Sequence, residues 1–582
     1  MKTLKKLLIA NVALALAPVC AMGAEPAENT KHLLPESDYP YWGEYRKVKY
    51  TDVKAAEWDW NNSIKDGWDW SLPPNVKPDE SSYSMIYRAN MRGMKKISEL
   101  KPVEFPSIPV VGFWCDWKDI EKNEGEYDFQ SLINMIKAAA EKGYGSMVRI
   151  HTAAPIFAPK WLEKYNVNII ENRKGKGDKV TPYDPSHPEF HKRYLKLVEA
   201  LGASGIPQMK EVKGMYVGYA SHSYGDEGIG PVPEDKNPDK FGHVLERLDA
   251  WAKISKGVER KVFMGGYSEY GLSKGFGIRR GFVEMYLYHI PDEIIGQRID
   301  PNGYLYVDEE NKIIKSGVRH GEENEEYSEM WTEPRTRYRF GRTTDSFQYR
   351  FFTSTLRLLQ MRVNDVMWNN DWVINPEMFV WAGLEMGHTA KNAPDAWCAL
   401  RESYLRESYM KKAGVTDASS GVKNLERWIY QRDSEGYETE PAVRINHTIK
   451  MWMVRPGKYY DYVARTGNKI GFFVDDNFLK GRNKKVAVKI SYFDFGKGKF
   501  SLAYNHDGEV KKETVECGDS GKVKTATFFI TADFLKNMPL KHDFEILGTD
   551  GYKPVVSFFR VVKVGNRGKN KIFPENKRHF CR

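Results

Sequence analysis

Between residues 105 and about 400, short apolar runs alternate with segments whose apolar residues recur every three or four positions. The short runs predict buried strands at residues 108–114, 145–152, 213–221, 261–268, 280–288, 315–327 and 364–370. The segments between them predict helices, as after Asp128, where an apolar face runs from Phe129 to Ala140 and Gly143 follows as terminator. About eight strand–helix units in roughly 300 residues predict a (β/α)8 TIM barrel over residues 105–415. A doubly wound open sheet is the alternative, although no glycine-rich phosphate turn follows the first predicted strand.

From residue 416 the pattern changes to a period of two, as where Val486, Val488 and Ile490 alternate with residues of the opposite face. This period predicts a C-terminal β-sandwich domain over residues 416–564, followed by a basic tail over residues 565–582. Residues 24–104 form a leader with a repeated Trp-Asp-Trp motif between Trp58 and Pro74. We expect this motif to pack on the barrel, with sugar binding as the alternative.

The first 23 residues place three lysines ahead of an apolar run that ends near small residues. This order predicts a secretory signal peptide over residues 1–23 and a secreted or periplasmic protein. Cys20 raises the alternative of a lipid anchor, but Val19 is a poor residue before a lipidated cysteine. No later window offers the roughly 20 apolar residues that a membrane span needs.

Composition narrows the class of partner. The formal net charge is +10 and aromatic residues make up 13% of the chain. A basic surface attracts anions, so we expect an anionic polysaccharide or oligosaccharide as substrate in preference to nucleic acid. The four cysteines outside the signal peptide have no paired spacing, and the histidines lack the spacing of a metal site, so no metal and no cofactor are expected.

Candidate chemistry lies where predicted strands end, because barrel enzymes carry catalytic groups there. The fourth predicted strand runs toward Glu227, which stands beside Gly228, and a later strand carries Glu322, Glu323 and Glu325. Cleavage of a glycosidic bond needs one protonated and one ionised carboxyl group. A retaining enzyme holds them about 5–5.5 Å apart and an inverting one about 6.5–9.5 Å. A solvated acidic loop is the alternative reading of the glutamate cluster.

The stretch WCDWKDIEKNEGEYDFQSL (residues 114–132) places Trp117, Glu121 and Gly125 ahead of Tyr-Asp-Phe. This arrangement resembles bacterial β-galactosidases and related clan-A glycoside hydrolases with a (β/α)8 barrel. The similarity continues through residues 138–162 and 183–202.

The resemblance implies a retaining two-glutamate mechanism. The acid/base of that clan falls on Glu227, although Asp226 stands where the clan has Asn. The nucleophile falls on Glu323 by preference, then on Glu325 and Glu322, with Glu329 and Glu333 as later options.

Further residues at or near strand ends are candidates for sugar binding, by stacking, hydrogen bonding or charge. They are Trp114, Asp116, Trp117, Arg149, His151, Trp161, His222, Asp226, His320, Trp331, Arg335 and Trp368. Arg335 opens a basic run with Arg337, Arg339 and Arg342, whose forked groups suit sulfate or carboxylate. For each aromatic residue a core role is the alternative, and for the arginine run a solvated helix flank.

The leading interpretation is a secreted glycoside hydrolase that cleaves a β-linked polysaccharide, with galactan, sulfated or otherwise anionic, as the first hypothesis. A non-catalytic glycan-binding protein with a degenerate barrel is the alternative, because Asp226 departs from the clan pattern. A secreted esterase is disfavoured by the lack of a GxSxG motif.

Overall fold

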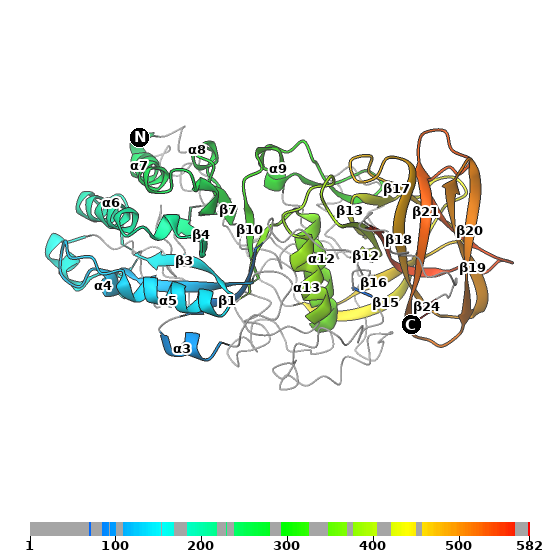
Figure 1. The fold of residues 1–582 in the computed structure, drawn as a ribbon, viewed down its shortest axis with the longest axis horizontal. Coiled ribbons are helices and arrows are strands. Elements are labelled where there is room, and N and C mark those ends of the chain that lie inside the picture. Colours follow the sequence, from blue (N-terminus) through cyan, green and yellow to red (C-terminus); the bar gives the residue numbers. More distant parts are fainter. Residues whose placement is uncertain are drawn as a thin grey trace, which may run out of the picture.

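The computed structural model describes residues 69–70, 84–91, 94–100, 109–152, 154–167, 183–217, 228–229, 238–279, 293–324, 347–368, 376–403, 421–449, 457–564 and 580–581 of the 582-residue chain. A parallel sheet with helices around it forms the N-terminal part, and antiparallel sheets form the C-terminal part (Figure 1). The helices Phe347–Gln360 (α12) and Pro376–Glu385 (α13) lie between the two parts (Figure 1).

The parallel sheet is a closed barrel of eight strands. In chain order these are β1 (Ser84–Met91), β2 (Pro109–Asp116), β3 (Gly145–His151), β4 (Val212–Val217), β6 (Val262–Gly266), β7 (Gly277–Arg279), β10 (His320–Asn324) and β11 (Asp365–Trp368). Each strand pairs in parallel with its neighbours in this order, and the pairings β1–β11 and β4–β6 complete the ring. The expected (β/α)8 barrel is therefore confirmed by the strand pairing itself.

Helices and helical turns connect the barrel strands. Ahead of α12 and α13 they are α3 (Met94–Ser98), α4 (Trp117–Ile120), α5 (Gln130–Glu141), α6 (Pro188–Ala203), α7 (Pro238–Ile254), α8 (Glu269–Ser273) and α9 (Lys312–Ser316), with 3-10 turns at Lys160–Tyr165, Ile206–Gln208, Glu259–Lys261 and Glu293–Ile295. Helix α5 buries Leu132, Met135, Ile136 and Ala139 on one face, as its apolar period predicts. Gly143 follows it with φ +89°, a conformation that glycine adopts without strain.

Two antiparallel sheets form the C-terminal β-sandwich. The larger sheet contains β12 (Asp395–Ser403), β13 (Val422–Arg427), β15 (Glu440–Ile449), β16 (Gly457–Thr466), β18 (Gly481–Phe493), β21 (Val523–Phe534), β23 (Val555–Lys563) and β24 (Phe580–Cys581). The smaller sheet contains β14 (Ile429–Gln431), β17 (Lys469–Val474), β19 (Lys497–His506), β20 (Glu509–Gly518) and β22 (Phe544–Gly548). Phe472 and Phe559 stack between the sheets with ring centroids 4.0 Å apart, so the predicted sandwich is confirmed.

Some elements differ from the sequence prediction. The first barrel strand is β1, which begins at Ser84, ahead of the expected start at residue 105. Likewise β12 joins the sandwich ahead of residue 416. The strand predicted over residues 315–327 is shorter, because α9 includes residue 315 and the strand β10 begins only at His320. The strand predicted at residues 280–288 lies outside the described residues.

The second Trp-Asp-Trp motif of the leader is built into the junction between barrel and sandwich. The Trp70 ring is buried against Phe352 of α12, Trp381 of α13 and Phe558 of β23, with centroids 4.8 to 6.0 Å away. The Asp69 carboxylate lies 2.8 Å from Lys489 Nζ of β18. Trp70 therefore packs on the helices α12 and α13 as well as on the sandwich, whereas Asp69 contacts the sandwich.

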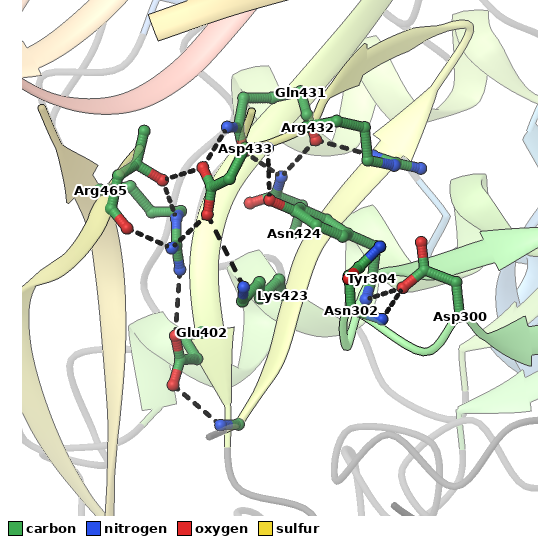
Figure 2. Close-up of polar contacts among 12 residues, drawn as sticks. Asp300, Asn302, Tyr304, Glu402, Lys423, Asn424, Gln431, Arg432, Asp433 and Arg465 are labelled. Carbon is green, nitrogen blue, oxygen red and sulfur yellow. Dashed lines mark hydrogen bonds and ion pairs between the residues drawn. The ribbon is translucent and has the colours of Figure 1, made fainter. Parts of the chain in front are cut away.

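A hairpin of β8 (Gln297–Ile299) and β9 (Leu305–Val307) also joins the two parts. It belongs to the connection between β7 and β10, and its tip lies against the sandwich (Figure 2). Tyr304 Oη accepts a 2.9 Å hydrogen bond from the Asp433 backbone N–H, and the Arg432 guanidinium lies 4.4 Å from the Tyr304 ring. Arg465 links Asp433 with Glu402 behind this contact (Figure 2).

A buried pair of carboxyl groups also lies at the junction. Asp395 bonds to Arg560 and accepts 2.9 Å from Trp381 Nε1, so it carries the charge. Burial and the nearby Asp395 raise the pKa of Glu385 well above its ordinary value. Glu385 therefore keeps a proton that the unfolded chain releases.

This proton makes stability depend on pH. As pH rises from the unfolded glutamate value toward the raised folded pKa, we expect the wild type to lose up to about 1.4 kcal/mol per pH unit relative to Glu385→Gln. Glutamine mimics the protonated form and does not ionise. Urea unfolding of both proteins across this range measures the difference, with Glu141→Gln on the exposed end of α5 as control. Parallel pH curves for wild type and Glu385→Gln would contradict the assignment.

Candidate active site

The carboxyl ends of the eight parallel strands meet at one end of the barrel, called here the mouth. In this fold the active site lies at that end. Among the described residues, Asp116 ends β2, His151 ends β3 and Val217 ends β4. The candidate site is formed by Asp116 and His151 together with Trp114, Arg149 and Tyr216, which lie on the interior face of the same strands.

An apolar layer closes the barrel beneath the mouth. Val110, Met147 and Phe263 pack together in the interior, and Trp114 and Tyr216 lie against them. The Arg149 guanidinium lies 4.9 Å from the Trp114 ring and 5.5 Å from the Tyr216 ring. Aromatic rings and a guanidinium group therefore form the floor of the mouth, above an apolar layer.

Arg279 adds a second cation to this floor from the other side. Its guanidinium lies 5.5 Å from the Tyr216 ring. Arg149 and Arg279 are 5% and 8% exposed, so both charges are largely withdrawn from water. Buried guanidinium groups require anionic or hydrogen-bonding surroundings, which suits a site that handles carboxylates.

Asp116 and His151 form a pair nearer the rim. Asp116 Oδ1 lies 3.4 Å from His151 Nδ1, and both residues are at most 5% exposed. The Trp114 ring meets the His151 ring edge-on at 5.5 Å, and Lys118 Nζ lies 3.6 Å from Asp116. The Asp116 carboxylate and the His151 imidazole are thus close enough to orient each other at the mouth.

Four predicted sugar-binding residues thus come together: Trp114, Asp116, Arg149 and His151. Trp117 does not join them, and its prediction as a stacking residue is wrong. It is fully buried, packs on Trp161 and Phe190, and donates a 2.6 Å hydrogen bond from Nε1 to Glu121. Its ring belongs to the core between barrel and helices. The Trp161 indole also bonds to Glu121, because its Nε1 donates a 3.0 Å hydrogen bond to the Glu121 backbone carbonyl.

Glu121 explains the spacing of the Trp-x-x-x-Glu motif. Its second oxygen accepts 2.8 Å from the Gly125 backbone N–H, and Gly125 has φ +82°. Burial raises the pKa of Glu121, while the hydrogen bonds from Gly125 and Trp117 oppose the rise. This glutamate closes a turn after the second barrel strand and takes no part in the mouth.

We expect Glu121→Ala to lower the free energy of unfolding by about 1–3 kcal/mol, because it leaves the Trp117 and Gly125 donors buried without their acceptor. Urea denaturation measures the loss. The exposed neighbour Glu126, replaced by alanine, is the control and should change stability by at most about 0.5 kcal/mol. Equal effects of the two substitutions would rule out this role.

His320 is a second correction. It begins β10 at the end opposite the mouth, is buried, and lies with Nδ1 3.3 Å from the Met361 carbonyl that follows α12. The side chain therefore faces the helix layer, away from the mouth. The prediction that His320 hydrogen-bonds sugar is wrong.

Strand β10 carries Glu322 and Glu323, whose backbone the structure describes. Glu323 pairs in register with Met367 of β11, and Asn324 pairs with Trp368. A Cβ on Gly321 would lie 3.3 Å from the Phe263 ring, so Gly321 faces the interior. Residues two apart share a strand face, which places position 323 on the interior face and position 322 on the face of His320.

The other candidates lie outside the described residues: His222, Asp226, Glu227, Glu325, Glu329, Trp331, Glu333, Arg335, Arg337, Arg339 and Arg342. Strand β5 (Gly228–Ile229), which directly follows Glu227 in the sequence, pairs in parallel with Gly265 and Gly266 at the carboxyl end of β6. The described chain next to Glu227 therefore runs along the mouth.

Sequence reasoning missed Tyr216 and Arg279. Both lie on the interior face by strand alternation, but β7 has only three residues and gives no periodic signal. Position 277 of β7 is a glycine because a Cβ there would lie 2.6 Å from the Arg319 carbonyl.

In the described part of the chain, one group of three potential metal ligands occurs, at His506, Asp507 and Asp533 in the sandwich, far from the mouth in sequence.

One known protein family matches part of the barrel. Residues 90–212 match the model of the glycoside hydrolase 42 family, described as beta-galactosidase. No curated protein sequence matches the chain significantly.

Similar solved structures include the β-amylase catalytic domain of Paenibacillus polymyxa, at 10% identity over 54% of this chain and 100% of that one, with a TM-score of 0.31. Xylanase 10B of Thermotoga maritima matches at 10% identity over 52% and 94%, with a TM-score of 0.28. The β-galactosidase of Marinomonas ef1 matches at 11% identity over 38% and 44%, with a TM-score of 0.24. Scores this low do not establish a shared fold, so the assignment of the barrel rests on strand pairing.

Within the described residues, no helix has the length and apolar character to cross a membrane. The family match includes the strands that bear Trp114, Asp116, Arg149 and His151. Over these residues the chain is similar to the β-galactosidases of this family, and this similarity supports its assignment as a glycoside hydrolase.

Proposed function

We propose that the protein is a secreted retaining glycoside hydrolase that cleaves β-linked, galactose-containing and anionic polysaccharide or oligosaccharide. Glu227 acts as acid/base and Glu323 as nucleophile. The observation that carries this proposal is the position of Glu323 in the seventh strand of a closed barrel, on the face shared with Gly321.

In the proposed mechanism, Glu227 protonates the leaving oxygen while Glu323 attacks the anomeric carbon. The bond from the sugar to the leaving group breaks as the bond to Glu323 forms. Glu227, now ionised, takes a proton from water, and the resulting hydroxide releases the sugar from Glu323. Trp114 offers a stacking face, and Asp116 and His151 offer hydrogen bonds to sugar hydroxyls.

Anionic substrates are supported by charge. The chain carries a formal net charge of +10, and Arg149 and Arg279 line the mouth. Guanidinium groups pair with sulfate and carboxylate through two parallel hydrogen bonds. Secretion is supported by the charge and apolar pattern of residues 1–23.

Purified protein should be tested with aryl β-glycosides and with neutral and sulfated galactans, with sizing of the products. We expect release of β-configured sugar as the first product, seen by proton NMR before mutarotation. Glu323→Gln should lose turnover and keep glycan binding. Binding without turnover by the wild type on every substrate would instead favour the glycan-binding alternative.

A further inference from the structure

The outer face of the smaller sandwich sheet carries an aromatic side chain that is open to solvent. Phe472 of β17 packs in the sandwich core, where it stacks on Phe559. Because successive residues of a strand point to opposite faces, Gly471 and Phe473 lie on the outer face. Phe473 is 40% exposed there, although it is a large apolar side chain.

Phe473 belongs to a cluster of three rings. Between centroids, the His542 ring lies 4.7 Å from the Phe473 ring and 4.4 Å from the Tyr437 ring. The imidazole lies directly over Gly471, where a Cβ would come within 2.5 Å of three of its ring atoms. Glycine at this position therefore lets the rings pack close to the sheet. Tyr437, Phe473 and His542 are called here the aromatic platform.

A buried carboxylate holds the platform in place. Glu545 of β22 pairs in register with Gly471. Its Oε1 accepts a 2.9 Å hydrogen bond from Tyr437 Oη and lies 3.1 Å from His542 Nδ1. Burial and the bond to Glu545 raise the pKa of Tyr437 to about 12, so this hydroxyl remains a donor. Rings that are already ordered lose less entropy when a ligand binds to them.

Two cations lie beside the platform. The Nζ atoms of Lys469 and Lys541 are 5.6 and 5.2 Å from the centroid of the Tyr437 ring, and both side chains are exposed. Lys541 also donates a 3.0 Å hydrogen bond to Ser434 Oγ. Neither lysine forms a salt bridge with a carboxylate of the described residues, and Glu438 of the same turn accepts a 3.0 Å hydrogen bond from a backbone N–H. Two ammonium groups at an exposed aromatic face attract an anionic ligand.

We propose that the aromatic platform, with Lys469 and Lys541, is a second glycan site that binds a chain of anionic polysaccharide apart from the mouth of the barrel. Phe473 and Tyr437 stack on sugar rings, and the two ammonium groups pair with sulfate or carboxylate substituents. Binding here raises the effective concentration of a long polymer at the mouth, because both sites hold the same chain. This last effect rests on the proposed function, whereas the binding itself does not.

The test is binding of the full chain to a sulfated galactan and to the same polymer after chemical desulfation. Affinity electrophoresis in the cold measures it, with sizing of the polymer afterwards to verify that it is intact. We expect the wild type to bind the sulfated polymer more tightly. Phe473→Ala should weaken binding of both polymers about 10-fold, as deletion of an aromatic anchor does. Lys469→Gln combined with Lys541→Gln should weaken binding of the sulfated polymer alone and reduce its dependence on salt.

Matched controls remove similar groups elsewhere on the sandwich. Val510→Ala deletes an exposed apolar side chain of β20, the edge strand of the same sheet. Lys497→Gln combined with Lys522→Gln removes two exposed lysine charges. Neither control should change the binding of either polymer.

The outcomes separate this inference from the proposed function. A wild type without preference for the sulfated polymer, or platform variants that bind as the controls do, overturns the inference while the proposed function stands. A protein that binds through the platform and cleaves no substrate overturns the proposed function and leaves the inference in place. If Phe473→Ala does not fold, as judged by circular dichroism, the double lysine variant at exposed positions supplies the comparison.

Discussion

Glu227→Gln is expected to lower kcat/KM for glycosides with poor leaving groups by about 10²- to 10⁴-fold, the contribution typical of general acid–base catalysis. The amide cannot protonate the departing oxygen and cannot take a proton from water afterwards. An aryl group that leaves without protonation still departs, so the glycosyl-enzyme should accumulate. Burst kinetics over a series of leaving groups measures both effects.

Azide tests whether the glycosyl-enzyme accumulates in Glu227→Gln, because this anion attacks the intermediate without losing a proton. It should restore turnover of Glu227→Gln on activated substrates and yield a glycosyl azide. Glu211→Gln is the matched control, because Glu211 stands just before β4 at the opposite end of the same strand. Undiminished turnover in Glu227→Gln would remove this residue from the mechanism.

Trp70→Ala is expected to lower the free energy of unfolding by about 3–5 kcal/mol, the usual cost of deleting a buried tryptophan side chain. The ring is 2% exposed and fills the space between α12, α13 and β23. The cavity would open between barrel and sandwich, so both parts should lose stability together. Urea unfolding followed by fluorescence and by circular dichroism measures the shift.

Two further variants calibrate that result. Trp70→Phe keeps an aromatic ring and should cost less than the alanine variant. Val510→Ala removes an exposed apolar side chain of β20 and should cost at most about 0.5 kcal/mol. A loss in Trp70→Ala no larger than in Val510→Ala would show that this ring does not anchor the junction.

The apolar periodicity of the sequence predicted most barrel strands, because a parallel strand buried on both faces reads as a continuous apolar run. β1 escaped detection because Arg88 and Asn90 interrupt such a run. β7 escaped because three residues are too few to show a period.

The candidate site was predictable in part. Strand ends predicted that Trp114, Asp116, Arg149 and His151 lie near one another, since the carboxyl ends of all barrel strands converge, and their role in sugar binding stays a prediction. Trp117 and His320 were misplaced for a geometric reason. If the predicted position of a residue along a strand is wrong by one, or on a helix by one turn, its side chain is assigned to the barrel interior when it faces the helix layer. The sequence alone does not decide between these two faces.

The hairpin β8–β9 belongs by sequence to the barrel, yet Tyr304 at its tip lies among sandwich residues (Figure 2). The same chain continues through α9 into β10 and so reaches Glu323. If the sandwich were replaced by that of another protein at the boundary near residue 395, the tip of this hairpin would face a surface that lacks its contact residues. The transferable module is therefore the sandwich together with its hairpin, and enzyme engineering by domain exchange has to move both.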